Sequence, residues 1–164
     1  MNRIQTMLAR HIREHGVVIQ FVFATEEHPG PTFAYTIGMT DIGAPELIVF
    51  GFPQELAGGL MNHLFNEMRT CNMPRDLEKI EDLMSVPLLL ESIDSDVALE
   101  YAVQADVYYA QRERKPVFKQ MLWPDEKGCY PYEKGFDPEL KDVQPYLGNK
   151  GRRLDFDDES PSLR

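Results

Sequence analysis

Apolar residues recur along this chain in two different patterns, and each pattern predicts a type of secondary structure. Strands are predicted for five runs of β-branched and aromatic residues, at 17–23, 33–38, 46–51, 86–93 and 116–123. Helices are predicted where apolar residues recur at helical spacing, at 2–15, 53–69 and 97–113. The pattern therefore predicts an α+β domain: a mainly antiparallel sheet of about five strands, with two or three helices packed on one side of it.

Each predicted helix has an apolar face. The first helix has Ile4, Met7, Leu8 and Ile12, and the last has Leu99, Val103, Val107 and Tyr108. The middle helix begins at Pro53 and carries Gly58 and Gly59, which each cost about 1 kcal/mol of helix stability relative to Ala. Close packing against the sheet would explain these two glycines.

Length and composition fit one soluble domain. The chain has 164 residues, of which 43% are hydrophobic, and no apolar run reaches the ~18 residues that a membrane span needs. The N-terminus has no continuous apolar segment of the kind found in signal peptides. Cys71 and Cys129 are too few for a disulfide framework. We therefore expect a cytoplasmic protein with reduced thiols.

The net charge of −10 limits the kinds of partner. An acidic chain repels nucleic-acid phosphates, so we expect no nucleic-acid binding. Because no apolar run is long enough to span a bilayer, we expect no membrane binding either. The acidity is either an ordinary solvated surface or a means of attracting a basic protein partner. Composition also changes along the chain, which predicts a domain over 1–136 and an acidic, flexible tail over 137–164 that ends in LDFDDESPSLR.

The segment QMLWPDEKGCYPYE at 120–133 concentrates aromatic and acidic residues in a stretch that cannot be a helix. Pro124 ends strand pairing, and DEKG at 125–128 suits a turn. Either this stiff loop presents a binding surface, or it folds back to cap the sheet with Trp123 in the core. Its candidate ligand-binding residues are Gln120, Trp123, Asp125 and Tyr132.

Two neighbouring strands supply the other candidates. Thr36 points to the opposite face from Tyr35, and Gly38 would let a ligand or another backbone approach closely. The simpler interpretation is that Thr36 is an ordinary strand residue and Gly38 ends the strand. Glu46 opens an apolar strand, so its carboxylate lies at the rim of the sheet or is tied to a partner, because burying it alone is costly.

Three segments occur in a characteristic order, namely FAYTIGM at 33–39, PELIVFGFP at 45–53 and the 120–133 segment. Together they resemble a bacterial family known as domain of unknown function 4262, over about residues 16–132. The resemblance implies a single small α+β domain of bacteria and their phages, with no established reaction. This chain has Tyr132 where the family tends to have Trp, and its acidic tail is not part of the family pattern.

Two functions remain open on these observations. The first is a small acidic binding module that recognises or neutralises a basic protein partner, or binds a small molecule. The second is an enzyme or cofactor protein, either a flavin protein of the split-barrel type or a small hydrolase. The flavin alternative rests on FAYTIG and PELIVFG, which are similar, over a short length, to the FMN-binding split barrel of flavin reductases. No motif for a nucleotide loop, a serine nucleophile or a zinc protease is present.

The histidines and the apolar surfaces bear on metal binding and on self-association. His11 and His15 lie four residues apart with no third ligand marked, so no metal site is expected. A homodimer is compatible with the apolar helix faces and the 116–123 strand, which would exceed what one subunit covers.

Overall fold

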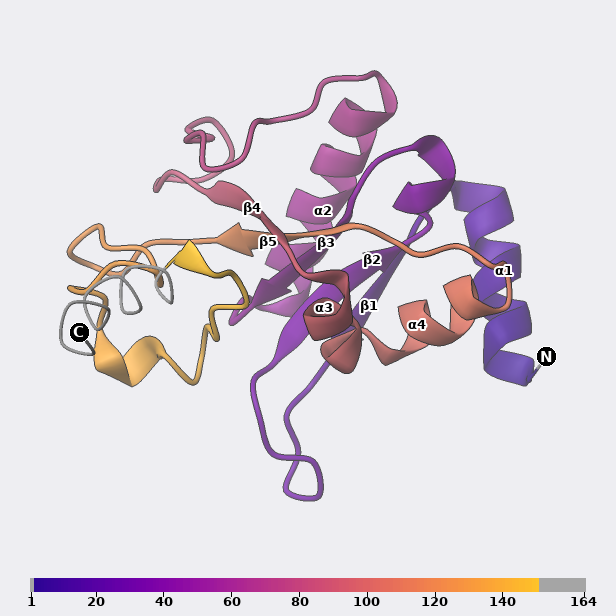
Figure 1. The fold of residues 1–164 in the computed structure, drawn as a ribbon, viewed down its shortest axis with the longest axis horizontal. Helices are drawn as coiled ribbons and strands as arrows, with labels where there is room; N and C mark the ends of the chain where they lie inside the picture. Colours follow the sequence, from indigo (N-terminus) through magenta and orange to yellow (C-terminus); the bar gives the residue numbers. More distant parts are fainter. Residues whose placement is uncertain (1, 151–164) are drawn as a thin grey trace, which may run out of the picture.

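The computed structural model describes residues 2–150 and confirms the α+β class (Figure 1). The five strands are β1 (Val18–Val22), β2 (Phe33–Ile37), β3 (Glu46–Phe50), β4 (Leu89–Ile93) and β5 (Phe118–Leu122). The helices are α1 (Arg3–His15), α2 (Gln54–Arg69), α3 (Ser95–Tyr101) and α4 (Val103–Ala110), with 3-10 turns η1 (Met39–Ile42) and η2 (Pro138–Leu140). Within residues 2–150, no helix combines the length and apolar character needed to cross a membrane.

The strands form one sheet in the order β1-β2-β3-β5-β4. All neighbours are antiparallel except β3 and β5, which run parallel with Glu46 opposite Phe118. The predicted antiparallel pairing of the first two strands is confirmed, with Val18 opposite Ile37. Because β5 lies between β3 and β4, both of its edges are paired, and the 116–123 strand offers no free edge to a second subunit.

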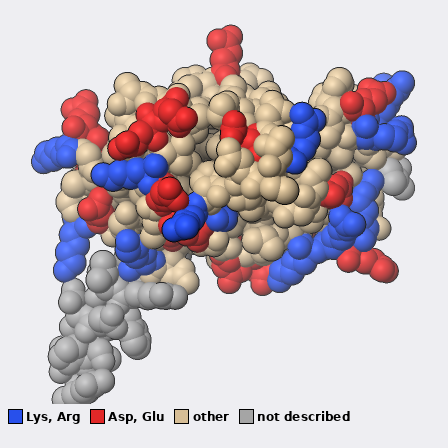
Figure 2. All heavy atoms as spheres, turned by 90° about the horizontal axis from the view of Figure 1, so that it is seen from above, with Lys and Arg blue, Asp and Glu red and all other residues tan. Residues whose placement is uncertain are grey.

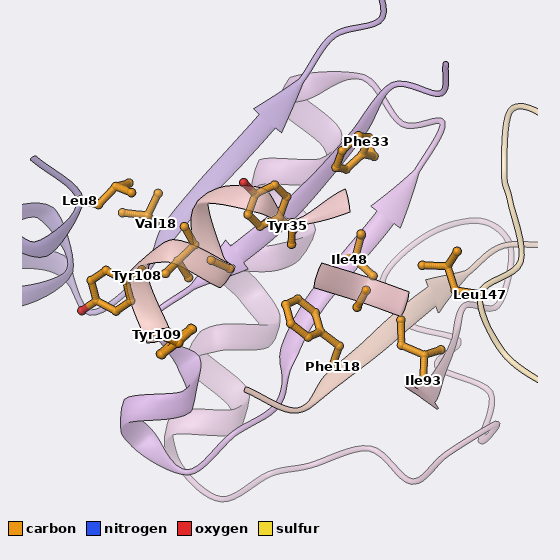
Figure 3. Close-up of a cluster of buried hydrophobic side chains, with 14 of the residues drawn as sticks. Leu8, Val18, Phe33, Tyr35, Ile48, Ile93, Tyr108, Tyr109, Phe118 and Leu147 are labelled. Atoms are coloured by element: carbon orange, nitrogen blue, oxygen red, sulfur yellow. The ribbon is translucent and has the colours of Figure 1, made fainter. Parts of the chain in front are cut away.

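Helices cover both faces of the sheet, so the expectation of helices on one side was wrong. α2 packs on one face, over Leu47, Val49 and Met121. α1, α3 and α4 pack on the other face, and Figure 3 shows that cluster, in which strand residues lie together with Tyr108 and Tyr109 of α4. β2 and β3 are buried at every position, which explains their continuous apolar runs in place of an alternating pattern.

The last predicted helix is divided in two at Ala102, and its buried face differs from the predicted one. Val103 and Val107 are exposed, whereas the buried positions are Ala98, Ala102, Ala105, Tyr108 and Tyr109. Small alanine side chains allow α3 and α4 to lie close to the sheet. Branched residues gave the stronger apolar signal in the sequence, but the close approach of the backbone favours alanine.

α2 begins after Pro53, as expected, and buries an apolar face that includes Leu60, Leu64 and Met68. The explanation for its two glycines was wrong. A Cβ atom added at Gly58 or Gly59 would have no heavy atom within 4 Å, so close packing does not require glycine at either position.

The first residues of the expected tail pack against the sheet. Gln120 of β5 is fully buried; its side-chain amide donates to the Pro145 carbonyl at 2.7 Å, and its oxygen accepts from the Leu147 N–H at 2.9 Å. Leu147 is itself part of the core. The segment up to residue 150 is therefore attached to the domain, and 151–164 lie outside the described residues.

Candidate functional site

The most concentrated group of polar contacts surrounds Glu46, the first residue of β3. Its side chain is fully buried. Oε1 accepts from the Thr36 hydroxyl at 2.8 Å and the Met39 N–H at 3.3 Å. Oε2 accepts from the Thr40 N–H at 2.8 Å, the Thr40 hydroxyl at 2.6 Å and the Tyr109 hydroxyl. We call these five residues the Glu46 network.

The chain reversal after β2 positions the donors of this network. Gly38 has φ 119°, and a Cβ atom there would lie 2.6 Å from the Gly16 carbonyl oxygen, so this position requires glycine. The turn aims the N–H groups of η1 at the carboxylate. The Gly38 N–H donates to the Tyr109 hydroxyl at 2.7 Å, and the Leu47 N–H donates to the Thr36 hydroxyl at 2.8 Å. Each of these hydroxyls therefore accepts from the backbone and gives its own hydrogen to Glu46.

Burial dominates the acid–base behaviour of the network. Burial raises the pKa of Glu46 above its ordinary value, and the hydrogen bonds from Thr40 and Tyr109 oppose that rise. Burial and the adjacent Glu46 charge raise the pKa of Tyr109, so its proton stays on the phenol. The network closes the turn between β2 and β3, and Thr36 and Glu46 are bound to each other instead of facing a ligand.

Trp123 is used in packing. Its indole N–H donates to the Phe50 carbonyl at 2.8 Å, and its ring stacks on Phe52 at 5.8 Å between centroids. Its backbone exchanges two 3.0 Å hydrogen bonds with the side chain of Gln144. Trp123 lines none of the hollows described below. These are the contacts of a residue that caps the end of the sheet.

Asp125 organises the turn that follows. The predicted DEKG turn forms, with the Gly128 N–H donating to the Asp125 carbonyl at 3.0 Å. The carboxylate is mostly buried and accepts from the N–H groups of Lys127, Cys129 and Asp137, each at 2.9 Å. These hydrogen bonds lower the pKa of Asp125, and the bond from the Cys129 N–H has the largest effect. It borders a hollow of about 220 Å³, but its oxygens are already occupied by the backbone.

Tyr132 is the middle one of three neighbouring phenol rings, stacked on Tyr130 and tilted against Tyr146. Its ring lies 6.1 Å from Tyr130 and 6.0 Å from Tyr146, and the Lys150 ammonium stands 4.3 Å from its centroid. The Tyr146 hydroxyl donates to Glu91 of β4 at 2.5 Å. These rings bind the end of the described chain to the outer edge of β4.

The sequence-predicted candidates therefore fall into two separate groups. Tyr35, Thr36, Gly38 and Glu46 lie around the turn after β2, and Tyr35 is a core residue whose hydroxyl accepts from the Gln104 N–H at 3.1 Å. Burial raises the pKa of Tyr35 to about 12. Gln120, Trp123, Asp125 and Tyr132 fasten the C-terminal segment. Three members of the Glu46 network, Met39, Thr40 and Tyr109, were not among the candidates.

A hollow of about 390 Å³ lies elsewhere, between α2 and the connection that follows it. Four carboxylate residues line it, and Leu64, Ile80 and Leu83 give it apolar parts. We call it the acidic hollow; its acidic residues are Glu67, Glu78, Glu81 and Asp82. Within residues 2–150, no three His, Cys, Asp or Glu residues gather in a way that would hold a metal ion.

Comparison with known proteins identifies a family for most of the chain. Residues 11–137 match the family described as domain of unknown function (DUF4262). The chain belongs to the DUF4262 family. The match covers every strand of the sheet and ends at Asp137, so the DUF4262 region includes both the Glu46 network and the acidic hollow. No curated protein and no solved structure matches the chain.

Proposed function

We propose that this DUF4262 protein is a cytoplasmic binding module whose acidic hollow receives a basic side chain of a protein partner. The observation that carries the proposal is the acidic hollow itself, whose volume of about 390 Å³ lies within the range of ligand sites. The Trp123 loop is not the docking surface in this proposal, because its rings and Asp125 are engaged within the chain.

The charges of the acidic hollow favour a cationic group. Its lining holds four carboxylates and two permanent cations, Arg75 and Lys79, so negative charge predominates. Of the four, Glu67 is engaged by the Asn72 side chain at 2.5 Å and by His63 at 3.9 Å. Glu78, Glu81 and Asp82 are exposed. Figure 2 looks down on this side of the molecule and shows Asp and Glu side chains standing out from the surface with Lys and Arg between them.

The apolar lining adds a second element of recognition. Lysine and arginine carry long apolar stems below their charged ends, and such stems bury well against aliphatic side chains. Leu64, Ile80 and Leu83 supply such side chains beside the carboxylates. The overall charge of −10 would further speed the encounter with a basic partner at low salt.

A charge-reversal experiment tests the proposal. The double substitution Glu78→Lys/Glu81→Lys reverses two exposed carboxylates of the hollow. Its matched control is Glu26→Lys/Glu27→Lys, which makes the same charge change in an exposed loop outside the hollow. Titration with a tetra-arginine amide, followed by amide chemical shifts, should show binding weakened about tenfold by the first pair and much less by the second.

Affinity capture from a bacterial lysate with the same proteins, at low and high salt, extends the test to natural partners. The wild type and the control should retain the same salt-sensitive protein, and the hollow variant should lose it. Equal retention by all three proteins, with amide shifts located away from the acidic hollow, would refute the proposal.

A further inference from the structure

Another hollow lies between α1 and the edge strand β1. This groove has a volume of about 340 Å³, and its lining residues are Ile4, Met7, Leu8, His11, Val18, Ile19 and Gln20. Ile4 and Met7 were predicted to face the core, but they are 54% and 63% exposed. The apolar face of α1 is therefore wider than the part that the sheet covers.

The surroundings of this groove differ in charge from the rest of the protein. α1 carries Arg3, Arg10 and Arg13 against a single acid, Glu14, in a chain whose net charge is −10. Glu14 lies 3.5 Å from Arg10. In Figure 2 the end of the molecule that holds α1 in Figure 1 carries several basic side chains. An occupant that is both apolar and acidic would complement the groove.

The chain contains one such sequence outside its described residues. Residues 154–159 read LDFDDE, in which Leu154 and Phe156 alternate with Asp155 and Asp157. In an extended conformation, alternate side chains point to opposite sides, so Leu154 and Phe156 can enter a groove while Asp155 and Asp157 stay outside it, within reach of charges at its rim. Ile4 and His11 are about 10 Å apart along α1, and extended residues 154–157 also span about 10 Å.

We propose that residues 154–157 of a second copy bind in the groove between α1 and β1, so that the protein associates with itself. Leu154 and Phe156 would cover Ile4 and Met7, and the carboxylates would face the arginines of α1. This interaction is independent of the function proposed for the acidic hollow, because the groove shares no residue with it.

The length of the chain after Lys150 indicates that residues 154–157 come from a second copy. Lys150 donates its N–H to the Tyr146 hydroxyl, which is bound to Glu91 of β4. β4 and β1 are the two edges of the sheet, separated by four strand spacings, or roughly 19 Å. Leu154 lies only four residues beyond Lys150 and can extend at most about 14 Å from it. A subunit therefore cannot fill its own groove with this segment.

Exchanging the charges of groove and segment tests this pairing in the full chain. Arg3→Glu/Arg10→Glu makes the groove rim acidic, and Asp155→Lys/Asp157→Lys makes the segment basic. Sedimentation should show the wild type associating as concentration rises, and each variant alone associating about tenfold more weakly or not at all. An equimolar mixture of the two variants should associate again, since each groove then meets a segment of opposite charge.

The apolar contact has its own variants. Ile4→Glu/Met7→Glu should abolish association, whereas Val103→Glu/Val107→Glu, which alters two exposed valines of α4, should leave it unchanged. A wild type that remains monomeric at every concentration reached would overturn the proposal. So would charge variants that associate as well alone as they do in the mixture.

Discussion

The Tyr109 hydroxyl provides a direct measure of how strongly the Glu46 network stabilises the fold. Tyr109→Phe removes one oxygen and keeps the ring. In the wild type this oxygen accepts from the Gly38 N–H and donates to Glu46, and all three groups are buried. The variant leaves the Gly38 N–H without that acceptor and Glu46 with four of its five donors.

The expected loss of stability in Tyr109→Phe follows from these two changes. A buried donor without a partner costs about 1–3 kcal/mol, and a hydrogen bond to a charged group contributes about 1.5–3 kcal/mol. Because the two terms share one oxygen and the site relaxes, we expect Tyr109→Phe to lower the free energy of unfolding by about 3 kcal/mol. For a chain of this length that corresponds to a fall in Tm of roughly 6–12 °C.

Urea unfolding followed by circular dichroism measures the effect, with Tyr101→Phe as the matched control. Tyr101 is also a helix tyrosine; its ring packs edge-on to Phe33 and Phe50, and its hydroxyl has no hydrogen bond within the described part of the chain. The control should change stability by less than about 0.5 kcal/mol. Equal stabilities for the two variants would show that the Glu46 network contributes little to the fold.

Three further predictions concern single positions. Gly58→Ala should raise the free energy of unfolding by about 1 kcal/mol in urea, because the added methyl group meets open space in a helix; no gain would contradict that geometry. Gly38→Ala should lower it by more than about 2 kcal/mol, since the methyl group would strike the Gly16 carbonyl from a left-handed backbone; a folded variant of wild-type Tm would disprove this. The pKa of Asp125 is lowered in the folded state, so its contribution is complete above the unfolded value of 3.8 and is lost as pH falls through the folded pKa. Urea midpoints measured from pH 6 to about 2 should therefore fall less steeply for Asp125→Asn than for the wild type, and parallel curves would exclude this linkage.

The strands were predictable because β-branched and aromatic runs are a local signal. All five were found to within three residues at each end, and Pro124 marked the end of β5. The strand order was not predictable, since it depends on contacts between distant segments. The sequence also did not show that helices cover both faces of the sheet. A continuous apolar run such as ELIVF does not indicate which of its side chains a helix will contact.

The candidate site was predictable only in part. The cost of burying a lone carboxylate indicated that Glu46 needed a partner, and it has five donors. Tyr109, 63 residues further along the chain, had no local signal for this role. For Trp123, composition showed an aromatic loop but not whether the ring pointed outward or into the core. The acidic hollow depends on the path of the connection after α2, which has little periodicity.

The central place of β5 has a consequence for synthesis of the protein. Among the strands of residues 2–150, β5 is the last to leave the ribosome, yet it separates β3 from β4. Until about residue 122 has emerged, β1, β2 and β3 can pair with one another, but the outer edge of β3 has no partner strand. β4 has no strand to pair with at this stage. Exposed strand edges of this kind invite pairing with other chains. Ribosome pausing before β5 would therefore lengthen the interval in which this protein is most prone to aggregate.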